Sequence, residues 1–133
     1  MKLEWVSFFF FFVAGLVHIY FFILESFLLQ KTDGYKYLKI PPSDHTAIKP
    51  WAFNQGFYNL FLALGIFLGL YFVLKLQVHV AGIVTSVFGF GMIGAGLVLF
   101  FSAPKLRRAA YLQIIPPALG FFFLAFHIIP FFK

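Results

Sequence analysis

The sequence predicts an all-α polytopic membrane protein, a bundle of four transmembrane helices. Of its 133 residues, 62% are hydrophobic and only 11% are charged, and the mean hydropathy is +0.96. A soluble domain is about 45–50% apolar and about 25% charged, so this chain lacks the polar residues that would cover a water-exposed surface. Its apolar residues fall into four windows of about twenty, the length of helix that crosses roughly 30 Å of hydrocarbon. We therefore expect a lipid bilayer to surround it.

The four windows predict helices over residues 5–29, 51–74, 80–101 and 109–132, within one integral membrane domain that covers 1–133. The windows lack the alternation of barrel strands, which favours helices. The first window follows a charged start, as in a signal peptide. However, its apolar run continues past residue 20 without a small-residue cleavage motif, so we expect it to be retained as a membrane helix.

The charged residues and the missing cysteines exclude several classes of function. The sequence has no cysteine, which excludes disulfides, thiolate catalysis and zinc–thiolate sites. The net charge is +6, but the basic residues lie in short connections between apolar windows. That distribution is typical of contact with anionic lipid, so we expect no nucleic-acid partner. We expect no cofactor.

The distribution of lysine and arginine predicts the orientation. Seven of the ten lie in the connections 30–50 and 102–108, and the other three are Lys2, Lys75 and Lys133. By the positive-inside rule, the protein is a multi-pass protein of the inner (plasma) membrane, with a cytoplasmic loop over 30–50 and both termini on the non-cytoplasmic side. We interpret this loop as an interfacial segment; a lid over a cytoplasmic site is the alternative.

The candidate site consists of polar side chains inside the predicted helices, where they are costly and are functional candidates by default. His18 and Glu25 share one face of the first helix, about 10 Å apart along its axis. That separation is too large for one metal ion, and no His-x-x-x-His pair is present, so we expect no metal site. Trp51 is interpreted as an interfacial anchor. The remaining candidates for ligand binding are Asn54, Gln55, Tyr58, Asn59 and Gln113.

Helix depth predicts that these side chains share the cytoplasmic half of the bundle. Counted at 1.5 Å per residue, Glu25 and Gln55 each lie roughly 6 Å inside the predicted ends of their helices. Pro116 and Pro117 free backbone carbonyls at a similar level of the fourth helix. We therefore predict a polar pocket formed by the first, second and fourth helices. The third helix is rich in glycine, which favours close helix packing and offers a surface for a homo-oligomer.

Two segments resemble a known family. VHIYFFILESFLL (17–29) and FNQGFYNLFLALG (53–65) are similar to the small bacterial four-span membrane proteins of domain of unknown function 1304. In that family, a His and a Glu on the first helix precede an N-Q-G-x-Y-N motif on the second. The resemblance implies a four-helix fold and a shared site, and it implies no activity. The matching positions are His18, Glu25, Asn54, Gln55, Gly56, Tyr58, Asn59, Gly82, Thr85, Gln113 and Pro116.

Three functions are left open by the sequence. In the first, the pocket binds or transports a small polar or amphiphilic molecule, with Glu25 as charge or proton partner, His18 as a deeper relay and the amides as a hydrogen-bonding cage. In the second, the protein is structural or accessory, its polar groups only hold helices or a partner together, and Glu25 pairs with Lys31. In the third, an intramembrane enzyme uses Glu25 and His18 as acid and base, although the sequence shows no nucleophile motif.

Overall fold

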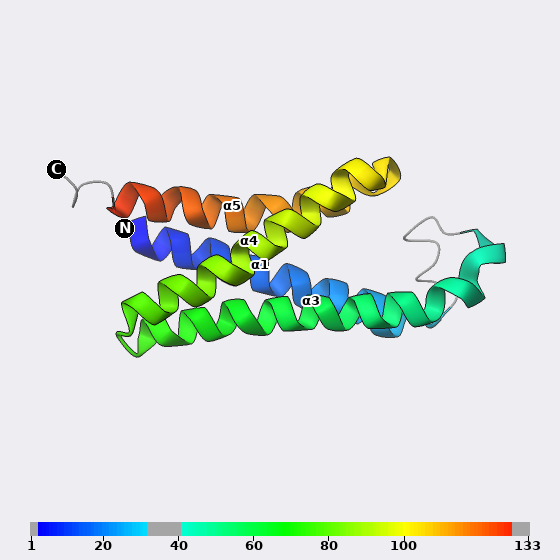
Figure 1. Ribbon diagram of the computed structural model, residues 1–133, viewed down its shortest axis with the longest axis horizontal. Helices are drawn as coiled ribbons and strands as arrows, with labels where there is room; N and C mark the ends of the chain where they lie inside the picture. Colours follow the sequence, from blue (N-terminus) through cyan, green and yellow to red (C-terminus); the bar gives the residue numbers. More distant parts are fainter. Residues whose placement is uncertain (1–2, 32–40, 129–133) are drawn as a thin grey trace.

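The computed structural model describes residues 3–31 and 41–128, and these form four long helices (Figure 1). All four are long and apolar enough to cross a membrane, which confirms the predicted all-α four-helix bundle. The long helices are α1 (Leu3–Ile23), α3 (His45–Leu74), α4 (Val78–Ser102) and α5 (Arg107–Ile128). Three short helical segments lie between them, η1 (Leu24–Leu28), η2 (Pro42–Asp44) and η3 (Pro104–Leu106).

The second long helix begins earlier than the sequence predicts. It starts at His45 and not at the predicted residue 51, so Pro50 lies inside α3. Proline has no N–H to donate to the carbonyl four residues back, and its ring crowds that carbonyl, which bends a helix. Figure 1 shows the first turns of α3 set at an angle to the rest of the helix. The predicted 30–50 loop thus includes η2 and these turns, and its residues 32–40 lie outside the described residues.

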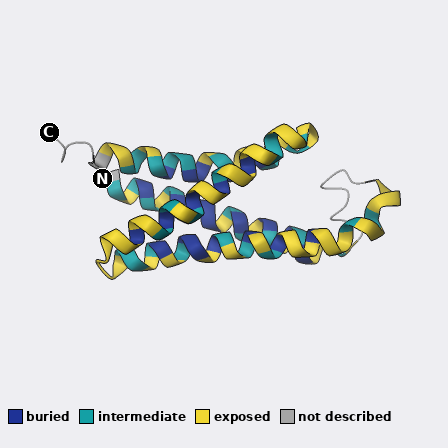
Figure 2. Cartoon of the chain, in the orientation of Figure 1, coloured by how far each residue is buried: buried dark blue, intermediate teal, exposed yellow. Residues whose placement is uncertain are grey.

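The long helices pack in a ring in which α1 and α4 each contact both α3 and α5. Side chains from three of the helices, Phe11, Ala14, Ile66 and Met92, form the buried core, and Phe121 of α5 packs against it. Large apolar side chains cover much of the outer surface (Figure 2). Such a surface suits lipid as the surrounding solvent.

Small residues allow the helices to approach closely. A Cβ atom added to Gly56 of α3 would meet Ser26 Oγ and would lie 3.0 Å from the Ser26 backbone nitrogen. A Cβ at Gly69 would likewise meet Thr85 of α4. The predicted packing role of the glycines in α4 applies to Gly89 and Gly96, which lie against α5.

The two ends of the bundle differ in shape. The start of α1, the end of α5 and the turn between α3 and α4 lie together at one end (Figure 1). At the other end, η1 lies beside the first half of α3, whereas the end of α4 and the start of α5 diverge from α3.

Candidate functional site

The first helix ends in a π-helical turn that the sequence did not predict. Leu24–Leu28 follow α1 directly, and the Leu29 N–H donates to the Leu24 carbonyl, five residues back, at 2.8 Å. Such turns within helices are rare and are frequent at functional sites. This one carries Glu25 and Ser26, so it sets the direction of both side chains toward α3.

Glu25 and Asn59 join the first helix to α3. The Asn59 Nδ2 donates to Glu25 Oε2 at 2.8 Å and to the Gln55 backbone carbonyl at 3.3 Å. Asn59 is only 3% exposed, so both of its amide hydrogens find acceptors where water is excluded. Glu25 and Lys31, both within the described residues, form no ion pair. The partner of Glu25 is Asn59, and not Lys31 as in the structural alternative above.

Two further contacts hold the first helix against α3 beside this pair. The buried Ser26 donates through its hydroxyl to the Phe53 carbonyl at 3.2 Å, next to the close approach at Gly56. The Gln30 side chain donates to the Lys49 carbonyl at 3.3 Å. Glu25 is therefore presented from a fixed backbone, which is the condition for a preorganised site.

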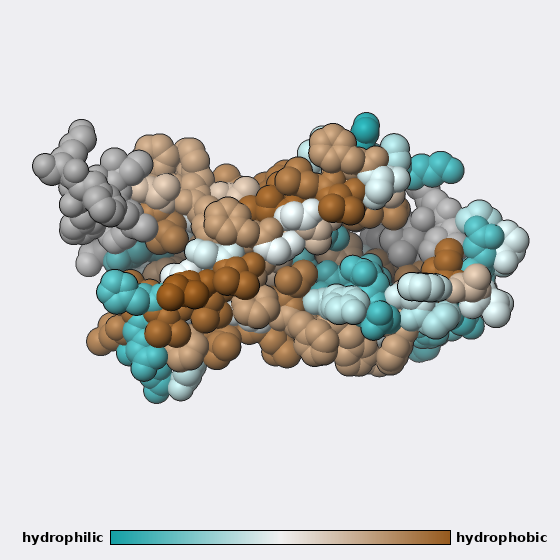
Figure 3. All heavy atoms as spheres, viewed as in Figure 1, coloured by the Kyte–Doolittle hydropathy of each residue, from teal (hydrophilic) through white to brown (hydrophobic). Residues whose placement is uncertain are grey.

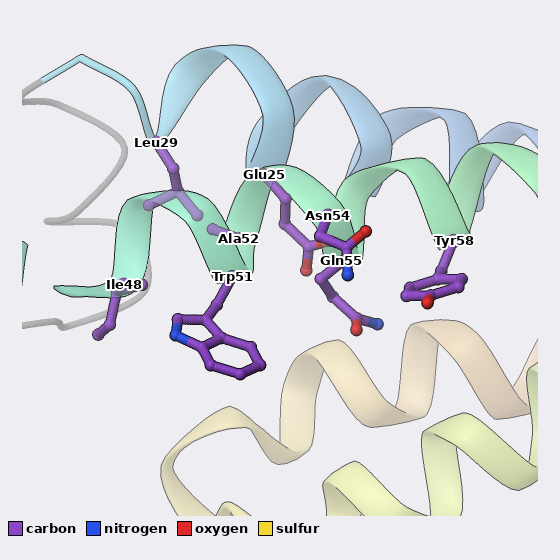
Figure 4. A pocket seen from close by; sticks show the side chains of 8 residues that line it. All are labelled: Glu25, Leu29, Ile48, Trp51, Ala52, Asn54, Gln55 and Tyr58. Carbon is purple, nitrogen blue, oxygen red and sulfur yellow. The ribbon is translucent and has the colours of Figure 1, made fainter. Parts of the chain in front are cut away.

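A pocket of about 520 Å³ lies between the π-helical turn and the first half of α3 (Figure 4). Its volume falls within the roughly 300–1,000 Å³ typical of small-molecule sites. Figure 4 shows Glu25, Asn54 and Gln55 pointing into the space between the rings of Trp51 and Tyr58. In Figure 3, hydrophilic atoms gather over this part of α3. The described lining is Glu25, Leu29, Ile48, Trp51, Ala52, Asn54, Gln55 and Tyr58.

The carboxamides of the pocket differ from that of Asn59 in being open to the surface. Asn54 and Gln55 are both exposed, and within residues 3–31 and 41–128 their side chains have no hydrogen-bond partner. Tyr58 is 55% exposed on the same side of α3. Three hydrogen-bonding side chains thus face a shared space with free donors and acceptors.

His18 and Gln113, which the sequence placed in the same pocket, do not line it. His18 is fully buried, with Nδ1 2.9 Å from the Ala14 carbonyl, and its Nε2 has no hydrogen-bond partner among the described residues. Gln113 is 8% exposed and lies against Gly96 at the contact of α4 and α5. The described pocket is therefore built by two helices, and the expected contribution of the fourth helix is not seen in its lining.

Besides the apolar lining residues Leu29, Ile48 and Ala52, sequence reasoning missed the contributions of Trp51 and Ser26 to the site. Trp51 lines the pocket although it was interpreted as an anchor, and its spacing to Gln55 and Tyr58, four and then three residues, is that of one helix face. Ser26 was considered only as a hydroxyl without a neighbouring base, although it follows Glu25 directly and holds the same turn to α3. The spacing was a usable signal for Trp51, whereas the role of Ser26 depends on the π-helical turn.

The electrostatic character of the pocket is set by one carboxylate. Glu25 is the acidic side chain of the described lining, and no lysine, arginine or histidine belongs to that lining. The described residues also contain no cluster of three side chains that could hold a metal ion. A second pocket, of about 320 Å³, lies between the start of α1 and the end of α3, and its described lining is wholly apolar apart from the Trp5 ring.

Comparison with known proteins supports the family resemblance. The family described as "Protein of unknown function (DUF1304)" matches residues 12–125 of the chain. No curated protein and no solved structure matches. The match covers all of the side chains that line the pocket between the π-helical turn and α3. The chain belongs to the DUF1304 family of proteins of unknown function.

Proposed function

We propose that this protein binds a small polar or amphiphilic molecule in the pocket between η1 and α3, and that it moves the molecule across or out of the membrane. The observation that supports binding is the convergence of Glu25, Asn54 and Gln55 on one pocket whose remaining walls are mostly apolar. A mixed lining of this kind accepts both the polar and the hydrocarbon part of an amphiphile.

The contrast between the amides favours binding over helix attachment alone. Asn59 is buried and hydrogen-bonded, as expected of a residue that holds two membrane helices together. Asn54 and Gln55 are exposed, and their side chains have no partner among the described residues, so they do not hold these helices together. A ligand gives these two amides a role that helix packing does not.

A structural or accessory role is the second candidate, and a specific observation favours it. The Glu25–Asn59 and Ser26–Phe53 hydrogen bonds both join the first helix to α3. On this interpretation, the polar residues of the family motif fasten the bundle and Glu25 binds nothing else. We do not propose an acid–base reaction by Glu25 and His18, because His18 does not line the pocket that Glu25 enters.

We further propose that the pocket faces the cytoplasm and that both termini lie on the other side of the plasma membrane. The support is the positive-inside rule. At the end of the bundle opposite to the pocket, Lys75 is the single lysine or arginine among the described residues. The pocket end carries the described basic residues Lys31, Lys49, Lys105, Arg107 and Arg108.

A homo-oligomer through α4 is also proposed. Gly82 and Gly94 are exposed, and a Cβ atom added to either would meet no described atom within 4 Å. Exposed glycines let the backbone of a second helix approach closely, which is how membrane helices commonly associate.

Native mass spectrometry of the gently solubilised protein tests the binding proposal. We expect a reproducible extra mass on the wild type that is absent from folded Glu25→Ala and Asn54→Ala. Gln77→Ala is the matched control, since it removes an exposed carboxamide in the turn at the opposite end. It should keep the extra mass. No adduct in any form, or an adduct that persists in both pocket variants, would contradict the proposal and favour the structural role.

A further inference from the structure

The charge of the ligand follows from the lining of the same pocket, and this inference rests on the proposed function. We propose that the pocket binds an organic cation that carries apolar groups, with its positive charge beside the Glu25 carboxylate and between the rings of Trp51 and Tyr58.

The first support is the incomplete set of partners around Glu25. Its Oε2 accepts one hydrogen bond, from the neutral amide of Asn59. An ionised carboxylate offers about four acceptor positions on its two oxygens, so this bond leaves most of its capacity unused. Acidic groups within membrane helices normally pair with a cationic or donating group. Among the described residues no lysine or arginine forms that pair with Glu25.

The second support is the absence of a competing cation in the described lining. Lys31 and Lys49 are close to the pocket in sequence, but both are exposed and neither lines it. The described lining of the pocket therefore carries one negative charge, on the Glu25 carboxylate. An anionic ligand, such as a lipid phosphate, would be repelled by Glu25 and would find no basic side chain there.

The third support is the arrangement of rings and apolar groups. Trp51 is 76% exposed and Tyr58 is 55% exposed, and both flank the amides on one side of α3. The faces of tryptophan and tyrosine attract cations, including alkylammonium groups that cannot donate hydrogen bonds. Leu29, Ile48 and Ala52 offer contacts for hydrocarbon. This combination of a carboxylate, two rings and an apolar wall matches a lipophilic cation.

A pair of probes with the same shape and opposite charge tests this inference. Tetraphenylphosphonium and tetraphenylborate are titrated calorimetrically into the purified full chain in a neutral detergent. We expect saturable binding of the phosphonium cation and binding of the borate that is at least tenfold weaker. Glu25→Gln removes the charge but keeps an oxygen that can accept from Asn59, so its fold should be retained. It should weaken binding of the cation at least tenfold.

Glu4→Gln is the matched control, because it removes the same charge from the far end of α1 and should leave cation binding unchanged. The chain has two tryptophans, so Trp5→Phe leaves Trp51 as the sole reporter. The fluorescence of Trp51 should change when the cation is added to the Trp5→Phe variant. It should not change when the cation is added to the double variant that also carries Glu25→Gln.

Three outcomes would overturn the cation proposal. Equal binding of both probes, unaffected by Glu25→Gln but lost when Trp51→Ala is made, would leave a pocket for amphiphiles without a preference for cations. Loss of cation binding in Glu4→Gln alone would move the site to the second pocket, beside Trp5. No binding of either probe would also overturn it, and the mass-spectrometric adduct would then decide separately whether the pocket binds anything.

Discussion

Two asparagines on one helix show that burial, and not residue type, decides what a carboxamide does in this protein. Asn59 is 3% exposed and donates to Glu25 Oε2 at 2.8 Å, whereas Asn54 is exposed and faces the pocket. A buried amide must have its hydrogen bonds satisfied within the protein. An exposed amide at the edge of a pocket is free to bind a ligand, so the two residues should respond differently to substitution.

Asn59→Ala should lower the free energy of unfolding by about 1 kcal/mol, and by about 2 kcal/mol at most, the range measured for hydrogen bonds between membrane helices. The variant loses a bond between helices and leaves Glu25 without its amide partner. Asn54→Ala is the control and should change stability by less than about 0.5 kcal/mol, as exposed substitutions commonly do. Reversible unfolding in mixed micelles measures both. A larger loss for Asn54→Ala than for Asn59→Ala would contradict this assignment.

At the scale of elements, hydropathy located the four helices but not the details that build the site. An apolar window reports only that about twenty residues can span the bilayer, so it does not detect the π-helical turn at Glu25. Nor does it show that α3 starts before Pro50, because a bent first turn lies outside the apolar window. Both features depend on how the end of the first helix fits against α3.

The sequence predicted how deep the candidate side chains lie in the membrane, but not how each helix is rotated about its axis. Counting residues from helix ends placed Glu25, Gln55 and Gln113 at a similar level, and the structure brings the first two together. It puts Gln113 against Gly96 instead, at the contact of α4 and α5. Depth follows from the rise of 1.5 Å per residue, whereas the direction of a side chain depends on how each helix is turned toward its neighbours. When a helix is apolar on all sides, its sequence does not show how the helix is rotated about its axis relative to its neighbours.

Gly56→Ala should separate the first helix from α3 at the site itself. The new Cβ would meet Ser26 Oγ and would crowd backbone atoms of Ser26 and Phe22, at 3.0 and 3.1 Å. Overpacking of this kind costs about 1–3 kcal/mol. Gly91→Ala is the control, because Gly91 is exposed and a Cβ there would lie 3.4 Å from the flexible Leu62 side chain. It should be neutral or stabilising by up to about 1 kcal/mol, through helix propensity.

Reversible unfolding of both glycine variants checks this expectation. Gly56→Ala should also be non-additive with Asn59→Ala, because both weaken one contact between the first helix and α3. Additive effects, or a Gly56→Ala variant as stable as the wild type, would show that the helices are not held as close there as the structure has them.

At the scale of the whole molecule, the ring of four helices leaves many of its large apolar side chains on the outside, and two glycines of α4 interrupt that surface. Gly89 and Gly96 of α4 contact α5 within the chain, whereas Gly82 and Gly94 face outward over open space. Lipid tails gain little from packing against glycine, but a second helix can approach it closely. The outward glycines are therefore where a second copy of the chain is expected to pack.

Gly94→Leu should weaken association of the chain by about tenfold or more, equivalent to about 1.4 kcal/mol. A leucine side chain there would hold the partner backbone away, while the fold should be unaffected because the position faces open space. Ala125→Leu, an equivalent enlargement at an exposed position of α5, is the control and should leave association unchanged. Single-molecule photobleaching in vesicles at graded protein-to-lipid ratios measures the monomer fraction of each form. A wild type that stays monomeric at every ratio, or equal weakening by both leucines, would exclude α4 as the interface and leave the pocket to act within one chain.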